Sequence, residues 1–148
     1  MEALLELIPE LDTLLGWLDL VLRVLVMAGP FAMLGLGLFY FLAAPKEANW
    51  TCGYRFSYGM AKVRSWQFMQ RLAGIVYSVV GLVLTIVMAV LCAKFKTMAP
   101  MDAVTLAGKM IVWELAIFIV SALAIDITVM VVFDSQGNRR KDFKGMKV

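Results

Sequence analysis

The sequence of 148 residues contains no histidine and only two cysteines, Cys52 and Cys92. Zinc sites are built from clusters of His and Cys, and nucleophilic hydrolases commonly use a histidine base, so we expect no metal, no cofactor and no catalytic residues. Charged residues are scarce too, at 17%, whereas soluble domains contain about 25%. A net charge of +3 is too small to indicate a nucleic-acid partner. The sequence therefore argues against an enzyme and against a soluble domain.

Hydrophobic residues are abundant instead, at 62% of the chain. Three long apolar stretches cover about residues 20–43, 72–93 and 110–132. As a helix, each is long enough to cross a bilayer core of roughly 30 Å. A helix also satisfies its own backbone polar groups, which lipid cannot do. The sequence predicts an all-α integral membrane protein with three transmembrane helices in a single domain, residues 1–148.

Residues 1–15 precede the first span and carry acidic residues between apolar ones at near-helical spacing, with Pro9 among them. They predict a short amphipathic helix at the outer membrane surface, after which Asp12 caps a second helix. The segment from Asp12 to the end of the first span is longer than the core is thick. We therefore expect this span to tilt, protrude or bend at Gly29-Pro30. The acidic N-terminus lacks the basic start of a signal peptide, so we expect the first span to be retained.

The basic residues favour one orientation. The inner loop, residues 44–71, and the C-terminal tail, residues 134–148, are rich in Lys and Arg, whereas the other connection is poorer and the N-terminus has none. Short Lys/Arg-rich segments stay in the cytoplasm. We therefore expect a multi-pass membrane protein with its N-terminus outside and its basic tail inside.

Three charged residues fall within the predicted spans: Arg23, Glu114 and Asp126. Each costs about 2.5–3.5 kcal/mol at a helix centre unless a partner or water offsets it. Arg23 and Glu114 are predicted at similar depth, about one turn inside their spans, so an interhelical pair is the first expectation. Asp19, one turn before Arg23, is an alternative partner. Separate snorkelling of both side chains to the surface is the third arrangement.

Asp126 is predicted about 10 Å from the inner end of the third span by helical rise. Arg71 opens the second span from the same side and is the expected partner. Ser78, Tyr77 and Thr128 are alternative hydrogen-bond donors. The residue is either half of a structural pair that orients the bundle or part of a proton or ion relay.

The inner loop carries the most specific motif of the chain. Its residues are, in order, Pro45, Asn49, Gly53, Tyr54, Arg55, Trp66, Arg71 and Gly74. This order and spacing resembles the signature of the SdpI/YhfL family of small bacterial membrane proteins, although Phe56 stands where that family has threonine. The resemblance implies a three-span, multi-pass protein of the bacterial cell membrane. It also implies that the protein gives immunity to a secreted membrane-active peptide toxin and can hold a transcriptional repressor at the membrane.

The same loop suits a membrane surface on physical grounds. Four amphipathic rings are expected at headgroup depth, those of Trp50, Tyr54, Tyr58 and Trp66. The neighbouring basic residues attract anionic lipid or an acidic partner. Gly53 would permit a turn that sends Arg55 back toward the bundle, to anchor the loop or to bind a partner. The alternative is an ordinary aromatic-and-basic membrane anchor. We expect residues 57–71 to form a short interfacial segment.

Three functions remain open from the sequence. The first is immunity to, or sensing of, a membrane-active toxin; the second is a small transporter or channel subunit built by self-association around Asp126; the third is an accessory subunit of a larger complex. Expected partners are the lipid bilayer, a peptide or protein toxin, and a second copy of the chain. Small residues that would let two copies approach closely are Ala28, Ala32, Gly35, Gly74, Ser78 and Gly81.

Overall fold

The computed structural model describes the backbone of residues 2–140 and the side chains from Thr13 onward. Its helices are α1 (Glu2–Leu42), α2 (Ser57–Met60), α3 (Val63–Cys92), the 3₁₀ helix η1 (Ala93–Thr97) and α4 (Pro100–Val132). Within this described range, the β pairing is limited to an isolated antiparallel bridge between Phe133 and Arg139. The prediction of an all-α protein is confirmed.

Three segments of the described chain are long and apolar enough to cross a membrane: Thr13–Leu42, Val63–Thr97 and Pro100–Val132. The expected number of transmembrane helices is therefore confirmed. Two of the helices begin earlier than hydropathy indicates, at Val63 instead of residue 72 and at Pro100 instead of residue 110. The predicted interfacial segment 57–71 is wrong for the most part, because most of it belongs to α3.

Local signals explain both early starts. The Ser65 hydroxyl donates to the carbonyls of Lys62 and Gly59, at 2.9 and 3.0 Å, and the Lys62 N–H donates to the Ser65 oxygen at 3.2 Å. The bond from the Lys62 N–H satisfies a backbone donor at the start of α3, as in a capping box, and the other two hold the Ser65 hydroxyl in place. Pro100 occupies the first turn of α4, where its missing N–H removes no helical hydrogen bond.

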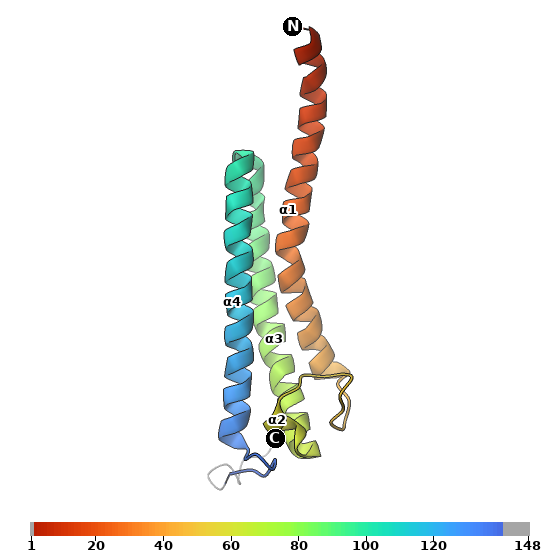
Figure 1. Ribbon diagram of the computed structural model, residues 1–148, viewed down its shortest axis with the longest axis vertical. Coiled ribbons are helices and arrows are strands. Elements are labelled where there is room, and N and C mark those ends of the chain that lie inside the picture. The colour runs from red at the N-terminus through yellow and green to blue at the C-terminus, as the bar shows by residue number, and fades with distance from the viewer. Residues whose placement is uncertain (1, 141–148) are drawn as a thin grey trace.

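The N-terminal segment differs from the expectation. Residues 2–12 are the first turns of a continuous α1, so the separate amphipathic helix is wrong and Asp12 lies inside the helix instead of capping it. The helix also continues through Pro9 and Pro30, each of which removes a single backbone donor. At 1.5 Å per residue, α1 is about 60 Å long. It protrudes well beyond the other two long helices in Figure 1, as the length of its span predicts.

The three long helices form an elongated bundle. Helices α3 and α4 make an antiparallel hairpin through η1, and α1 runs alongside, parallel to α4 and antiparallel to α3 (Figure 1). We call the end that carries residues 43–62 and 133–140 the loop end, and the end that carries η1 the hairpin end. Residues 141–148, which include three of the five basic residues of the predicted tail, lie outside the described residues.

Helix α1 packs mainly on α3, and glycines allow the close approach. A Cβ atom built on Gly74 would lie 2.7 Å from the backbone N of Phe41, and one on Gly81 would lie 2.6 Å from the backbone N of Leu34. Of the small residues considered for self-association, those on α3 therefore serve the contact between helices of one chain. Gly35 on α1 faces open space. Self-association itself stays a prediction.

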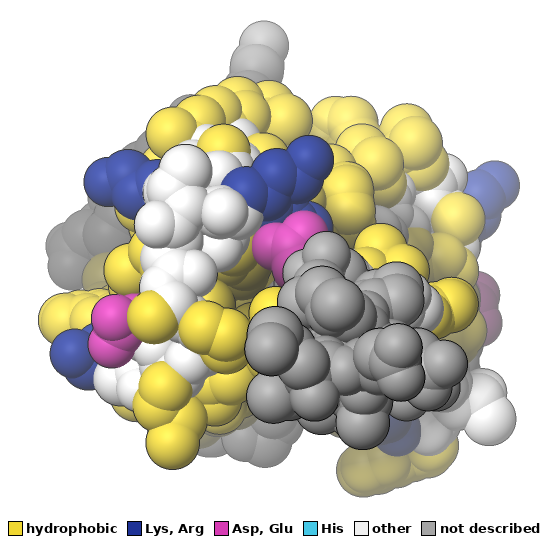
Figure 2. Space-filling model, turned by 90° about the horizontal axis from the view of Figure 1, so that it is seen from above, with side chains coloured by type: hydrophobic (Ala, Val, Ile, Leu, Met, Phe, Trp, Pro, Cys, Tyr) yellow, Lys and Arg dark blue, Asp and Glu magenta, His cyan; other side chains and the backbone are white. Residues whose placement is uncertain are grey.

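The outer surface of the bundle is strongly apolar. Side chains of all three long helices that are more than half exposed include Val24, Phe31, Val79, Trp113 and Ile127. Viewed from above, separate charged side chains lie among a majority of hydrophobic ones (Figure 2). Such a surface suits contact with lipid chains.

Candidate functional site

At the loop end, Gly53 turns the chain so that Tyr54 enters the bundle. The φ of Gly53 is +103°, a conformation that glycine adopts without strain. The Tyr54 N–H then donates to Gln70 Oε1 at 2.8 Å, and Gln70 Nε2 donates to the Tyr54 carbonyl at 2.6 Å. Gln70 is buried on α3, where an amide needs protein partners. The backbone of one loop residue satisfies both the oxygen and the nitrogen of its side chain.

The Tyr54 side chain continues across the bundle to α4. Its hydroxyl donates to Asp126 Oδ1 at 2.9 Å, and the Ala122 carbonyl lies 3.2 Å from the same hydroxyl. The rings of Tyr40 and Tyr77 stand edge-on or tilted around it, with centroids 6.1 and 5.9 Å away. Burial, and next the hydrogen bond to Asp126, raise the pKa of Tyr54, so the phenol stays neutral.

Other motif residues fix the path of the loop. The buried Trp66 donates from Nε1 to the Pro45 carbonyl at 2.7 Å, and its ring lies where a Cβ on Gly53 would meet it at 2.8 Å. Asn49 Oδ1 accepts the N–H groups of Cys52 and Thr51 at 2.7 and 3.1 Å, which is a side-chain-closed turn. Pro45, Gly53, Tyr54 and Trp66 thus belong to one connected cluster with Gln70, and Asn49 closes a local turn beside it.

Arg55 and Arg71 do not join that cluster. Arg55 is exposed and donates to the Trp50 carbonyl, so the expectation that Gly53 sends Arg55 toward the bundle is wrong. The turn brings in the neighbouring Tyr54 instead. The predicted pair of Asp126 with Arg71 is also wrong, because Arg71 lies more than two turns inside α3 with an exposed side chain.

Arg23 is paired locally. Its Nε donates to Asp19 Oδ2 at 2.8 Å, an i,i+4 ion pair on α1, and its guanidinium carbon lies 5.9 Å from the centre of the Phe95 ring. The first expectation, an ion pair with Glu114, is therefore wrong, and the alternative with Asp19 is confirmed. The reason is depth: α1 meets Glu114 at Gly29, which is six residues, or about 9 Å, beyond Arg23.

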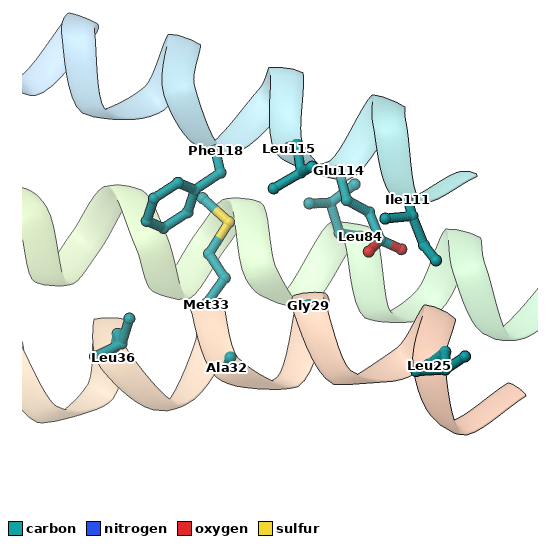
Figure 3. A pocket seen from close by; sticks show the side chains of 10 residues that line it. All are labelled: Leu25, Gly29, Ala32, Met33, Leu36, Leu84, Ile111, Glu114, Leu115 and Phe118. Atoms are coloured by element: carbon teal, nitrogen blue, oxygen red, sulfur yellow. The ribbon is translucent and has the colours of Figure 1, made fainter. Parts of the chain in front are cut away.

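Glu114 is the exceptional charge of the bundle. Because α4 begins at Pro100, this residue lies about 21 Å along the helix, near its middle, instead of one turn inside. Its side chain is 7% exposed, and Oε1 has no hydrogen-bond partner among the described residues. It projects from α4 toward α1 at a cavity (Figure 3). Of the two acids predicted within the third span, Asp126 therefore has a hydrogen-bond donor, whereas Glu114 Oε1 has none among the described residues.

Sequence patterns do not single out Gln70, and they select Gly29 only as part of a bend at Gly29-Pro30, although both residues matter to these sites. Gln70 could have been found from its register, since it follows Trp66 by four residues and precedes Tyr77 by seven, which puts all three on one buried face. Gly29 carries no comparable signal. Its importance follows only from the position of the Glu114 carboxylate opposite it.

Comparisons with protein-family models, curated proteins and solved structures found no match to this chain. Its class therefore follows from the structure: a helical protein with three helices able to span a membrane. A hydrogen-bonded loop closes one end, and a carboxylate is buried between the helices. The resemblance to the SdpI/YhfL family stays a prediction.

Proposed function

We propose that the chain is a multi-pass protein of the bacterial cell membrane that protects a cell against, or senses, a secreted membrane-active peptide toxin. The proposal starts from the resemblance of the loop motif to the SdpI/YhfL family. The observation that carries it is the way in which the loop is held: motif residues bond it to α3 and α4, while Trp50 and Arg55 stay exposed on it.

An exposed aromatic ring beside a guanidinium is a favourable contact pair for a protein or peptide partner. Trp50 is 80% exposed, and its carbonyl accepts the hydrogen bond from Arg55. Trp and Arg are enriched among the residues that contribute most to binding. Because the loop is anchored at Tyr54 and Trp66, little freedom is lost when a partner binds.

The orientation belongs to the same proposal. Among the described residues, the loop end carries five basic side chains and η1 at the hairpin end carries two, and short basic segments are retained in the cytoplasm. The exposed pair would then face the cytoplasm or the inner headgroups, where a repressor or the inserted part of a toxin could meet it. The protruding N-terminal part of α1 would extend outside.

Co-expression with secreted toxins encoded beside the gene tests the proposal, with membrane potential and survival as readouts. We expect the wild-type protein to preserve both and Arg55→Lys to lose most of the protection at normal membrane level, because lysine lacks the planar fork of donors. Lys46→Arg, on the same loop, is the matched control and should protect fully. No protection by the wild-type protein would contradict the proposed function. Full protection by Arg55→Lys would show that Arg55 does not bind a partner and acts only as a positive charge that sets the orientation in the membrane.

A small transporter subunit is the second candidate, and one observation favours it. A carboxylate without a partner in the middle of a membrane helix is a typical feature of ion and substrate pathways. That residue is Glu114, and not Asp126, whose Oδ1 accepts the Tyr54 hydroxyl.

A further inference from the structure

A cavity of about 340 Å³ lies between α1 and α4, against α3. Its walls are apolar side chains and one glycine, apart from a single charged residue, Glu114. Figure 3 shows the side chains that surround it, with the carboxylate directed from α4 toward α1. The cavity is separate from the loop cluster around Tyr54, on which the toxin proposal depends. Through Glu114 it belongs to the second candidate function, that of a transporter subunit.

The carboxylate is placed in the cavity without any protein group to neutralise it. Its Oε1 has no hydrogen-bond partner in the described part of the chain, and Arg23, the basic residue nearest along α1, is bonded to Asp19. A buried charge of this kind is strongly unfavourable unless a counter-charge or hydrogen-bond donor reaches it. The site therefore lacks one component, a cation or a donor.

Gly29 provides the room for the carboxylate. A Cβ atom at this position would lie 2.5 Å from Glu114 Oε2, closer than any contact between such atoms allows. Any other residue at position 29 would push the carboxylate away from α1. The contrast with Gly35, where a Cβ atom would meet nothing within 4 Å, shows that this constraint is local.

The donor set excludes a tightly bound inorganic cation. Hard metal ions take about six or more oxygen ligands, and the cavity offers one carboxylate among apolar side chains. Within the described residues, no three His, Cys, Asp or Glu side chains are grouped to hold a metal ion. An apolar wall favours an apolar ligand, and the single charge favours one positive group on it.

The cavity is accessible from the side of the bundle. Leu25 and Leu36 on α1 and Leu115 on α4 line it and are 54%, 39% and 58% exposed on the surface. In a membrane, these residues would contact lipid chains. A molecule dissolved in the bilayer could therefore enter between α1 and α4 without passing through either end of the protein.

We propose that this cavity binds a lipophilic organic cation from the bilayer, with Glu114 as its counter-ion and Gly29 as the residue that makes room for the carboxylate. The apolar body of the ligand fills the space between α1 and α4, and its positive group faces Glu114. The ligand class is thus a hydrophobic molecule that bears one amine, phosphonium or similar cationic group.

Equilibrium binding of radiolabelled tetraphenylphosphonium to the purified full-length protein in detergent tests the site. We expect saturable binding of one cation per chain. Glu114→Gln should weaken it by about tenfold or more, the effect of losing one charged contact. Radiolabelled tetraphenylborate has the same four-phenyl shape and the opposite charge, so when it is tested alone it should show no saturable binding. Non-saturable binding of the cation, equal binding by Glu114→Gln, or saturable binding of tetraphenylborate would each overturn the proposal.

A matched pair of glycine variants keeps the test independent of Glu114→Gln. Gly29→Ala should weaken binding because the added methyl displaces the carboxylate, while Gly35→Ala, on the same helix, should bind like the wild type. Asp102→Asn should also bind normally, since that acid is exposed in the first turn of α4. Equal binding by both glycine variants would overturn the assignment of the cation to this cavity.

Discussion

The Tyr54 hydroxyl donates a hydrogen bond of 2.9 Å to Asp126 Oδ1, across 72 residues of sequence. This contact ties the loop between α1 and α3 to α4. It also satisfies an acid that would otherwise be buried in part without a donor. The position of the exposed Trp50 and Arg55 therefore depends on a bond inside the bundle.

Removing the Tyr54 hydroxyl should destabilise the protein. Tyr54→Phe leaves the half-buried Asp126 without its donor, and we expect a loss of about 1–3 kcal/mol in the free energy of unfolding. Chemical denaturation in detergent, followed by circular dichroism, measures it. Tyr58→Phe should stay within about 0.5 kcal/mol, because the Tyr58 ring stacks on Phe56 outside this network.

A double-mutant cycle identifies the partner. Tyr54→Phe and Asp126→Ala should be coupled by about 0.5–3 kcal/mol, as residues in direct contact are. Arg71→Ala should show no coupling to Asp126→Ala, because the Arg71 side chain is exposed on α3. Coupling of Asp126 to Arg71 instead of Tyr54 would restore the ion pair expected from the sequence.

Replacement of a glycine by alanine should destabilise the protein on α3 but not on α4. Gly81→Ala places a methyl group 2.6 Å from the backbone of Leu34, and overpacking of this kind costs about 1–3 kcal/mol. Gly108→Ala meets nothing within 4 Å and should be neutral or stabilising by up to about 1 kcal/mol, since alanine favours a helix. Thermal unfolding of the two variants in the same detergent checks the sign. Destabilisation by both substitutions would show that Gly108 also packs closely against another part of the protein.

The turn after α4 should depend on pH. Hydrogen bonds from the Asn138 N–H, first, and from the Asn138 side chain and the Gln136 N–H lower the pKa of Asp134, and Lys62 adds a favourable charge. A lowered pKa in the folded state means that the stabilisation is present above the ordinary value of about 3.9 and is lost as pH falls through the folded value. The NMR amide signals of Gln136 and Asn138 should therefore shift between pH 6 and pH 3. In Asp134→Asn this shift should disappear; its persistence would assign the effect to another group.

The natural cysteines report the orientation. Cys52 is exposed at the loop end, Cys92 is buried near the hairpin end, and both are free thiols. A membrane-impermeant maleimide should leave Cys52 unmodified in intact cells and label it after the cells are broken. Lys96→Cys in a Cys52→Ser background lies at the other end of the bundle, so this cysteine should be labelled already in intact cells. Labelling of Cys52 from outside would reverse the proposed topology.

Much of the loop motif could be recognised from the sequence, but the roles of its residues could not. Order and spacing select Tyr54, Arg55 and Trp66 together, and all three belong to one loop cluster or its exposed edge. Which of the adjacent residues 54 and 55 enters the bundle depends on the conformation of Gly53. A left-handed φ rotates the chain that follows it, and composition carries no information on that rotation.

The number of long helices was determined by the sequence itself, because each span must be apolar and must satisfy its own backbone hydrogen bonds over a fixed length. The Asp19–Arg23 pair could also be predicted from the sequence, since both residues lie on one helix, four positions apart. Only the tertiary structure decided that Asp126 meets Tyr54 and that Glu114 meets Gly29. Those contacts depend on where α3 and α4 begin, on the rotation of each helix about its axis and on the path of the loop. A shift of one turn, about 5.4 Å, changes every partner along a helix.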